Sequence, residues 1–200
     1  MKIRTGFVLL LACAAALTAE PAGKGKKAVS SAPRDYANTL ATLQTEQGDI
    51  TIKFLYDKAP NHVKNFVDLA TKGFYDGTFF HRVIPGFMIQ GGDPNTKKPA
   101  SDANRYGVGG SGTNVKAEFN DTSHKRGIVS MARSSDPNSA SSQFFIVVKD
   151  STFLDGQYSA FGEVVSGLDV ADKIVSAPRG ASDLPNQPVR IKKILLSQAK

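Results

Sequence analysis

The segment that spans residues 79–93, FFHRVIPGFMIQGGD, contains the side chains with the clearest chemical potential in the chain. It brings one arginine, Arg82, close in sequence to Phe87, Met88 and Gln90. None of these four side chains is an obvious nucleophile, general base or metal ligand. A fixed cation beside apolar walls suits a site that binds an apolar group and stabilises a polar distortion of it. The segment therefore favours binding and electrostatic stabilisation over bond cleavage.

Two short strands joined by the Pro85-Gly86 turn are predicted to carry this segment. Successive side chains of a strand point to opposite faces. The parity of the residue number therefore assigns each side chain of this segment, and each of residues 143–146, to one of two faces. The residues expected to fill the interior are Val83, Ile89, Phe144 and Ile146. The residues expected to point outward together are Arg82, Met88, Gln90, Gln143 and Phe145. This mixture on an outer face predicts a groove, and the alternative is a packed outer layer under a long loop.

Most of the remaining pattern is typical of β-strands. Alternation on both sides of residues 47–49 predicts a hairpin. A last strand contains Ile191 and Ile194, and its change of phase predicts a bulge near Lys192. Further strands are predicted at residues 79–84, 87–91, 127–132, 143–148 and 160–165.

Two segments have the pattern of helices. At residues 59–72, apolar residues recur with helical spacing from Val63 to Ala70, with Pro60 in the first turn. A short helix is predicted at residues 168–176, before Pro178. Residues 93–116 are rich in Gly, Ser and Asn and predict a long surface loop. Many antiparallel strands with two helices, without strict alternation, predict a mainly β fold that closes into a barrel.

The N-terminus has the features of an export signal. Lys2 and Arg4 precede an apolar run at residues 7–17, which has the length of a secretory h-region and is too short to span a bilayer. We assign residues 1–19 to a signal peptide, which predicts an exported, periplasmic protein.

The only cysteine, Cys13, lies inside that signal, and two interpretations remain open. It is either a passive residue of the apolar run, with cleavage near Ala16 or Ala19, or a lipoprotein attachment site. In the second case the signal ends before Cys13 and the mature chain contacts a membrane through the lipid. Either way the mature domain has no disulfide, so its stability must come from packing.

Residues 20–37 predict a flexible basic linker between the signal and a domain at residues 38–198. The linker is rich in small residues and proline, and its lysines contribute to the net charge of +7. The more specific alternative is that these lysines contact anionic lipid or nucleic acid. No aromatic residue interleaves with Lys24, Lys26 and Lys27, and an exported protein meets little nucleic acid. We therefore expect no nucleic-acid partner.

Other reactive motifs are weak or missing in the sequence. His62, His81 and His124 show no metal spacing, and His81 is expected to be a hydrogen-bonded core histidine. Residues 107–112 match G-x-G-x-x-G, but no helix pattern follows and no βαβ unit surrounds them. Neither G-x-S-x-G nor G-K-[ST] occurs, so serine-hydrolase and P-loop functions lack support. We expect no metal and no cofactor.

Residues 80–93 resemble the signature of cyclophilin-type peptidyl-prolyl cis-trans isomerases. Three further blocks match in the same order, at residues 127–133, 141–146 and 153–156. The resemblance covers about residues 38–198 and implies a cyclophilin-like fold, a closed eight-stranded antiparallel β-barrel capped by two α-helices. It implies rotation of X–Pro bonds in proline-containing polypeptides. A proline-binding module or holdase chaperone that uses the same groove is the alternative, and nothing in the sequence demands more than a monomer.

Site residues follow from the same resemblance. Arg82 resembles the catalytic arginine, and Gln90 resembles the polar partner of the substrate backbone. Ala132 and Arg133 lie on the strand that pairs with the peptide, although asparagine is common at position 133. The pocket for the proline ring is implied at Phe87, Met88, Phe145 and Leu154.

Two substitutions at the rim of that pocket resemble the exported bacterial branch of the family. Phe153 stands where many members have a tryptophan that contacts cyclosporin, so weak cyclosporin binding is expected. Tyr158 stands where eukaryotic members have a histidine.

Overall fold

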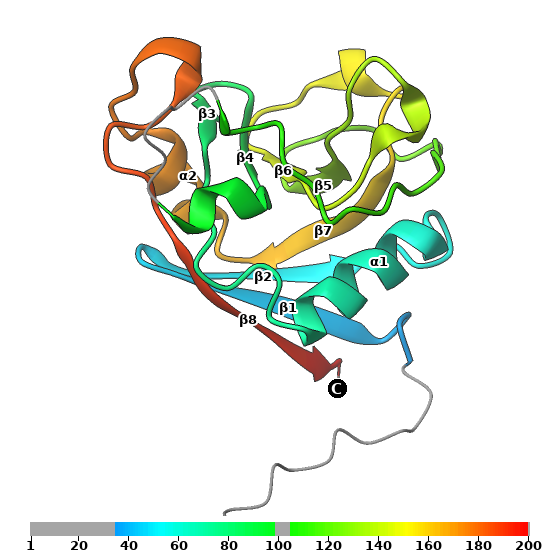
Figure 1. The fold of residues 1–200 in the computed structure, drawn as a ribbon. Helices are drawn as coiled ribbons and strands as arrows, with labels where there is room; N and C mark the ends of the chain where they lie inside the picture. The colour runs from blue at the N-terminus through cyan, green and yellow to red at the C-terminus, as the bar shows by residue number, and fades with distance from the viewer. Residues whose placement is uncertain (1–34, 99–104, 200) are drawn as a thin grey trace, which may run out of the picture. The chain divides into compact units, whose positions relative to one another are not determined.

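The computed structural model describes residues 35–98 and 105–199. Eight strands form one antiparallel sheet in the order β3-β4-β6-β5-β7-β2-β1-β8 (Figure 1). The strands are β1 Thr39–Thr45, β2 Gly48–Phe54, β3 Arg82–Ile84, β4 Met88–Gly91, β5 Ile128–Met131, β6 Phe144–Val147, β7 Ala160–Ser166 and β8 Ile191–Gln198. The helices are α1 Pro60–Thr71 and α2 Leu168–Val175. The predicted eight strands and two helices are confirmed, and both helices lie within a residue of their predicted ends.

The sheet is curled, but its edge strands β3 and β8 do not pair along a ladder. An isolated bridge joins Phe79 to Arg190, and the backbone N–H of Ile191 donates to the carbonyl of Thr78 at 2.8 Å. The expected closure of the barrel by continuous pairing is not confirmed. The predicted strand at residues 79–84 is reduced to the three residues of β3, which is too short to continue the ladder along the eight residues of β8.

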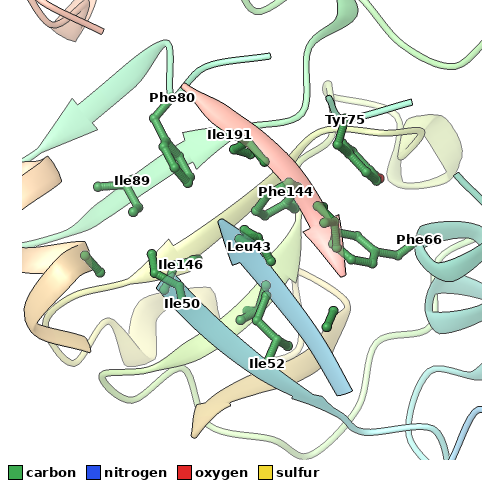
Figure 2. Packing of buried hydrophobic residues seen from close by; sticks show 14 of the residues in the cluster. Leu43, Ile50, Ile52, Phe66, Tyr75, Phe80, Ile89, Phe144, Ile146 and Ile191 are labelled. Carbon is green, nitrogen blue, oxygen red and sulfur yellow. The ribbon is translucent and has the colours of Figure 1, made fainter. Parts of the chain in front are cut away.

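Apolar side chains from the β1–β2 hairpin and from the later strands fill the concave side of the sheet. Figure 2 shows Leu43 and Ile50 from the hairpin packed near Phe144 and Ile146. The four residues that parity assigned to the interior, Val83, Ile89, Phe144 and Ile146, are all fully buried. The predicted division of the strands into two faces is therefore confirmed for the interior face.

Helix α1 is held to this core by an aromatic residue. The ring of Phe66 lies 4.9 Å from that of Tyr75 and 5.4 Å from that of Phe144, measured between centroids. The buried face of α1 includes the residues whose spacing predicted the helix, from Val63 to Ala70.

The predicted bulge in the last strand is confirmed. Gln44 pairs with Lys193, and the next residue, Thr45, pairs with Ile191, so Lys192 is the extra residue of the bulge.

The loop after β4 is anchored by a buried carboxylate. Asp93 is fully buried, and its side chain accepts hydrogen bonds from the backbone N–H groups of Asn95 at 2.8 Å and Gly107 at 2.6 Å. The N–H of Gly109 donates to the same side chain at 3.3 Å, and a Cβ at Gly109 would overlap the carboxylate. The described part of this segment is mostly the irregular loop that its composition predicts, with a short 3-10 turn at Pro94–Lys97 and an isolated bridge from Val115 to Ala140.

The predicted signal peptide at residues 1–19, including Cys13, and residues 20–34 of the predicted linker lie outside the described residues. Within residues 35–98 and 105–199, no helix has both the length and the apolar character needed to cross a membrane.

Candidate active site

A single row of cross-strand partners crosses the outer face of the sheet. Arg82 on β3 pairs with Gln90 on β4, Gln90 pairs with Phe145 on β6, and Phe145 pairs with Ser130 on β5. Because direct partners project from the same face, these side chains are neighbours. The outer face that parity predicted is thus confirmed, and it lines a cleft of about 710 Å³.

The floor of the cleft is an apolar cluster separate from the main core. Phe145 is only 5% exposed, and it packs with Met88, Val147 and Leu154. Tyr158 meets the Phe145 ring edge-on, with centroids 5.6 Å apart. Phe87 and Ala132 complete the wall. The result is a hydrophobic pocket beside a cation, which suits a compact apolar group with a polar neighbour.

Arg82 stands at the polar side of this pocket. Its side chain is 44% exposed, and its Nε lies 3.4 Å from Oδ2 of Asp183. Among the described residues, its terminal Nη groups make no hydrogen bond that would occupy them. They can donate to a group bound in the cleft, and guanidinium stays charged at any physiological pH.

Two glutamines form the next part of the wall. Nε2 of Gln90 donates to Oε1 of Gln143 at 2.9 Å. Gln143 in turn donates to the carbonyls of Gly107 at 2.9 Å and Gly109 at 2.8 Å. These contacts fix the orientation of Gln90, whose own amide oxygen has no partner within the described part of the chain. That oxygen can accept a backbone N–H from a bound peptide.

A chain of polar side chains, buried at His124 and Ser130 and partly exposed at Asp155, supports the Phe145 ring from behind. The His124 ring lies nearly parallel to it, with centroids 6.3 Å apart and planes 20° apart. Nδ1 of His124 contacts Oδ1 of Asp155 at 2.9 Å, and Nε2 contacts Oγ of Ser130 at 2.9 Å. This is the Ser-His-Asp order of a hydrolase triad, but Ser130 is fully buried and cannot reach a substrate. The chain therefore serves as a support.

The Asp155 carboxylate is stabilised in its charged form. Its pKa is lowered chiefly by the backbone N–H of His124, and further by the Ser123 hydroxyl and the His124 ring. The Ser123 hydroxyl donates to Oδ2 of Asp155 at 2.8 Å, and Nδ1 of His124 lies 2.9 Å from Oδ1. A charged Asp155 holds the imidazole in one orientation against Phe145.

Arg133 marks the junction of the cleft with a second cavity of about 360 Å³. Its guanidinium lies 4.7 Å from the Tyr158 ring centroid, and its Nε donates to the Gln157 carbonyl at 3.0 Å. Ala132, Gln90 and Gly107 also line both spaces. The two cavities therefore share a wall of common residues, which an extended peptide could follow.

Most of the site residues predicted from the sequence come together here. Those that line the main cleft are Arg82, Phe87, Met88, Gln90, Ala132, Arg133, Phe145, Leu154 and Tyr158. Gln143 lines the second cavity instead. Phe153 lies outside both linings, 65% exposed, with its ring 5.4 Å from that of Phe87.

His81 differs from its expectation as a hydrogen-bonded core histidine. It is buried and lines the cleft, but neither ring nitrogen has a hydrogen-bond partner among the described residues. Burial lowers its pKa, although nearby Asp93 opposes the shift. The expected burial of His81 is confirmed, but the expected hydrogen bond is not made, because parity can place the ring but cannot supply a partner for it.

Several lining residues were missed. Tyr106 and Gly107 come from the loop after β4, and Ser182, Asp183 and Leu184 come from the loop after α2. Neither loop has a periodic pattern, and the second is far from Arg82 in sequence, so no local signal could place them. Within the described residues, no group of three or more His, Cys, Asp or Glu side chains is arranged to hold a metal ion.

Comparison with known proteins assigns the family. A model described as "Cyclophilin type peptidyl-prolyl cis-trans isomerase/CLD" matches residues 40–195. Peptidyl-prolyl cis-trans isomerase B of Escherichia coli (strain K12) is 42% identical over 174 residues, covering 80% of this chain and 100% of the relative. Peptidyl-prolyl cis-trans isomerase A of Dickeya dadantii (strain 3937) is 45% identical over 169 residues, covering 82% and 84%.

A solved structure is similar along the same region. The cyclophilin type peptidyl-prolyl cis-trans isomerase of Cryptosporidium parvum, crystallised in the presence of the dipeptide Ala-Pro, has a TM-score of 0.72 and 32% identity. The similarity covers 80% of this chain and 99% of that one. With its fold, its cleft and these relatives in agreement, the chain belongs to the cyclophilin-type peptidyl-prolyl cis-trans isomerases.

Proposed function

We propose that this protein accelerates rotation about X–Pro bonds in exported proteins as they fold, with Arg82 stabilising the twisted amide and the Phe145 pocket holding the proline ring. The observation that carries the proposal is the row in which Gln90 lies directly between Arg82 and Phe145. It puts a cation, a backbone acceptor and an apolar pocket within the span of one proline and its neighbours.

The reaction at such a site breaks no covalent bond, but the energy barrier to rotation is large. Amide resonance sets a rotation barrier of roughly 18–20 kcal/mol. In the twisted transition state that resonance is lost, and the proline nitrogen regains a lone pair that accepts a hydrogen bond. A guanidinium donor aimed at that nitrogen binds the transition state more tightly than either ground state. Such a bond contributes about 2–4 kcal/mol, which corresponds to roughly two to three orders of magnitude in rate.

The remaining residues hold the substrate while its bond rotates. The pocket around Phe145 fixes the pyrrolidine ring, and the Gln90 amide oxygen accepts an N–H of the peptide backbone. The carbonyl before the proline then swings toward the open side of the cleft. The Cryptosporidium parvum relative was crystallised with Ala-Pro present, which supports a proline-containing peptide as the ligand here.

Magnetisation exchange between the cis and trans signals of an Ala-Pro peptide tests the activity. The purified protein is expected to raise the exchange rate at substoichiometric concentration. Unchanged exchange, with the fold verified by circular dichroism, would contradict the proposal.

The second candidate is a binding module or holdase. It is favoured by the second cavity, whose shared residues extend the groove beyond the size of one proline. Suppression of client aggregation by wild-type protein and by Arg82→Ala separates the two functions. A holdase keeps full suppression in the variant, whereas suppression through faster folding is lost with turnover.

The export of this protein rests on the sequence of residues 1–19 alone. Mass spectrometry of the mature N-terminus distinguishes cleavage after the apolar run from lipidation at Cys13, and cell fractionation tests the periplasmic location. A chain that retains Met1 and stays in the cytoplasm would contradict this part of the proposal.

A further inference from the structure

An acidic residue from a distant loop reaches the arginine of the cleft. Oδ2 of Asp183 lies 3.4 Å from Nε of Arg82, and Oδ1 of the same carboxylate lies 3.3 Å from Nε of Arg179. Asp183 also lines the cleft, with its side chain 31% exposed. It is the only carboxylate in the described residues that forms an ion pair with Arg82.

The backbone that presents Asp183 is strained. Ser182 and Asp183 have φ values of 58° and 59°, and they are the only non-glycine residues with positive φ in the described part of the chain. L side chains enter this left-handed region only at a cost in free energy, and such strain concentrates at functional sites. Two consecutive residues in this conformation turn the Asp183 side chain toward β3. In Figure 1 the orange loop after α2 lies beside that strand.

The loop is braced on both sides of the strained pair. The N–H of Gly180 donates to the carbonyl of Leu184 at 2.8 Å, and the N–H of Asn186 donates to that of Pro178 at 2.8 Å. These contacts lock the loop ends together, so the position of Asp183 is set by the loop and not by the ion pair alone.

The geometry of the pair determines which donors remain for a substrate. The carboxylate lies beside Nε of the Arg82 guanidinium, at 3.4 Å, and forms no hydrogen bond with its terminal Nη groups. Arg179 shares the same carboxylate, so the three side chains together keep one net positive charge. The carboxylate restrains one side of a long, flexible arginine and leaves a net positive charge at the cleft, and preorganised electrostatic catalysis needs both.

We propose that Asp183 is a positioning residue: it orients the Arg82 guanidinium so that its Nη groups face the proline nitrogen of the bound peptide. This inference rests on the proposed function of Arg82. Asp183 itself touches no substrate in this scheme. Its contribution is confined to the transition state, so it affects kcat and leaves KM nearly unchanged.

The experiment is a double-mutant cycle of Arg82→Ala and Asp183→Asn, with kcat and KM measured on an Ala-Pro peptide. Asp183→Asn keeps the shape of the side chain and removes its charge. It is expected to lower kcat by about threefold to tenfold, with KM within about twofold of wild type. In the Arg82→Ala background the same change is expected to have no further effect, because Asp183 acts through Arg82. Asp183→Glu, which keeps the carboxylate, is expected to retain more kcat than Asp183→Asn.

A matched control is available on α2. Asp172 forms an ion pair of 2.7 Å with Arg126, away from the cleft, and its side chain is also partly exposed. Asp172→Asn breaks a comparable Asp–Arg pair and is expected to leave kcat and KM at their wild-type values. Thermal melts of all variants exclude unfolding as the cause, and Asp183→Glu provides the test if Asp183→Asn does not fold.

Three outcomes would overturn the inference. They are a wild-type kcat in Asp183→Asn, an increase in kcat that marks Asp183 as a competitor of the substrate, and an equal loss in the Arg82→Ala background. Failure of the proposed function is a different result: the wild-type protein would not accelerate exchange, or Arg82→Ala would turn over at the wild-type rate.

Discussion

Nε2 of Gln90 donates a hydrogen bond to Oε1 of Gln143 at 2.9 Å, and this bond connects the wall of the cleft to the loop after β4. Gln143 completes the tie by donating to the carbonyls of Gly107 and Gly109. The cleft wall thus depends on the side-chain amide of Gln143, which contacts both β4 and the loop that follows it.

Gln143→Glu tests this tie, because it preserves the shape of the side chain and removes its donors. The two glycine carbonyls lose their partner, which costs about 1–3 kcal/mol of unfolding free energy. We expect KM to rise several-fold, since the wall that receives the peptide loosens. Peptide titration and denaturant unfolding measure the two effects, and unchanged KM and stability would show that the loop is held by other contacts.

Phe145→Leu tests the apolar pocket. Leucine keeps the site apolar but removes the flat ring that packs on His124 and Tyr158. KM for an Ala-Pro peptide is expected to rise, with a loss of about 1–3 kcal/mol in stability. Leu195→Ala on β8 removes an exposed apolar side chain of the described sheet and is the control that should leave KM unchanged. Equal KM values for all three proteins would exclude the pocket as the proline site.

Asp155→Asn tests the support behind Phe145. Because hydrogen bonds from His124 and Ser123 lower the pKa of Asp155, its contribution to stability is present above the ordinary value of 3.8 and is lost as pH falls through the lower folded-state value. The variant should lack this part of the acid transition, and its kcat/KM should fall because His124 loses its fixed orientation. Acid unfolding curves identical to those of wild type would show that Asp155 does not contribute to the acid transition.

His81 gives the cleft a pH dependence. Burial lowers its pKa below the ordinary 6.5, so the unfolded chain binds a proton before the folded protein does. The free energy of unfolding should therefore fall as pH drops from about 6.5 toward the folded-state pKa, and should be unaffected above that range. Asp93 and Arg82 are the charged groups that act on the ring, in opposite directions. His81→Gln should flatten this slope, and an unchanged slope would assign it to His62, whose pKa is also lowered by burial.

Local pattern was sufficient where neighbours along the chain determine the structure. The spacing from Val63 to Ala70 predicted α1, and the phase change near Lys192 predicted the bulge, because each depends only on which face is buried. Parity also placed Arg82 and Phe145 on one face.

Pattern failed where distant segments meet. The approach of Asp183 to Arg82 depends on the strained loop after α2, and the unpaired ring of His81 depends on which groups the fold leaves around it. The open edge between β3 and β8 has a similar origin. It arises because Phe79 forms only an isolated bridge with Arg190 and residues 79–81 do not extend β3, and strand propensity does not distinguish a bridge from a strand.

The central claim is that Arg82 stabilises the twisted amide, and kcat/KM of Arg82→Ala on an Ala-Pro peptide tests it most directly. Arg82→Lys is the matched variant, since it keeps the charge but loses the planar set of donors. We expect Arg82→Ala to lose about two to three orders of magnitude in kcat/KM, with its fold and its affinity for the peptide retained and Arg82→Lys in between. Turnover by Arg82→Ala within a few-fold of wild type would contradict the account.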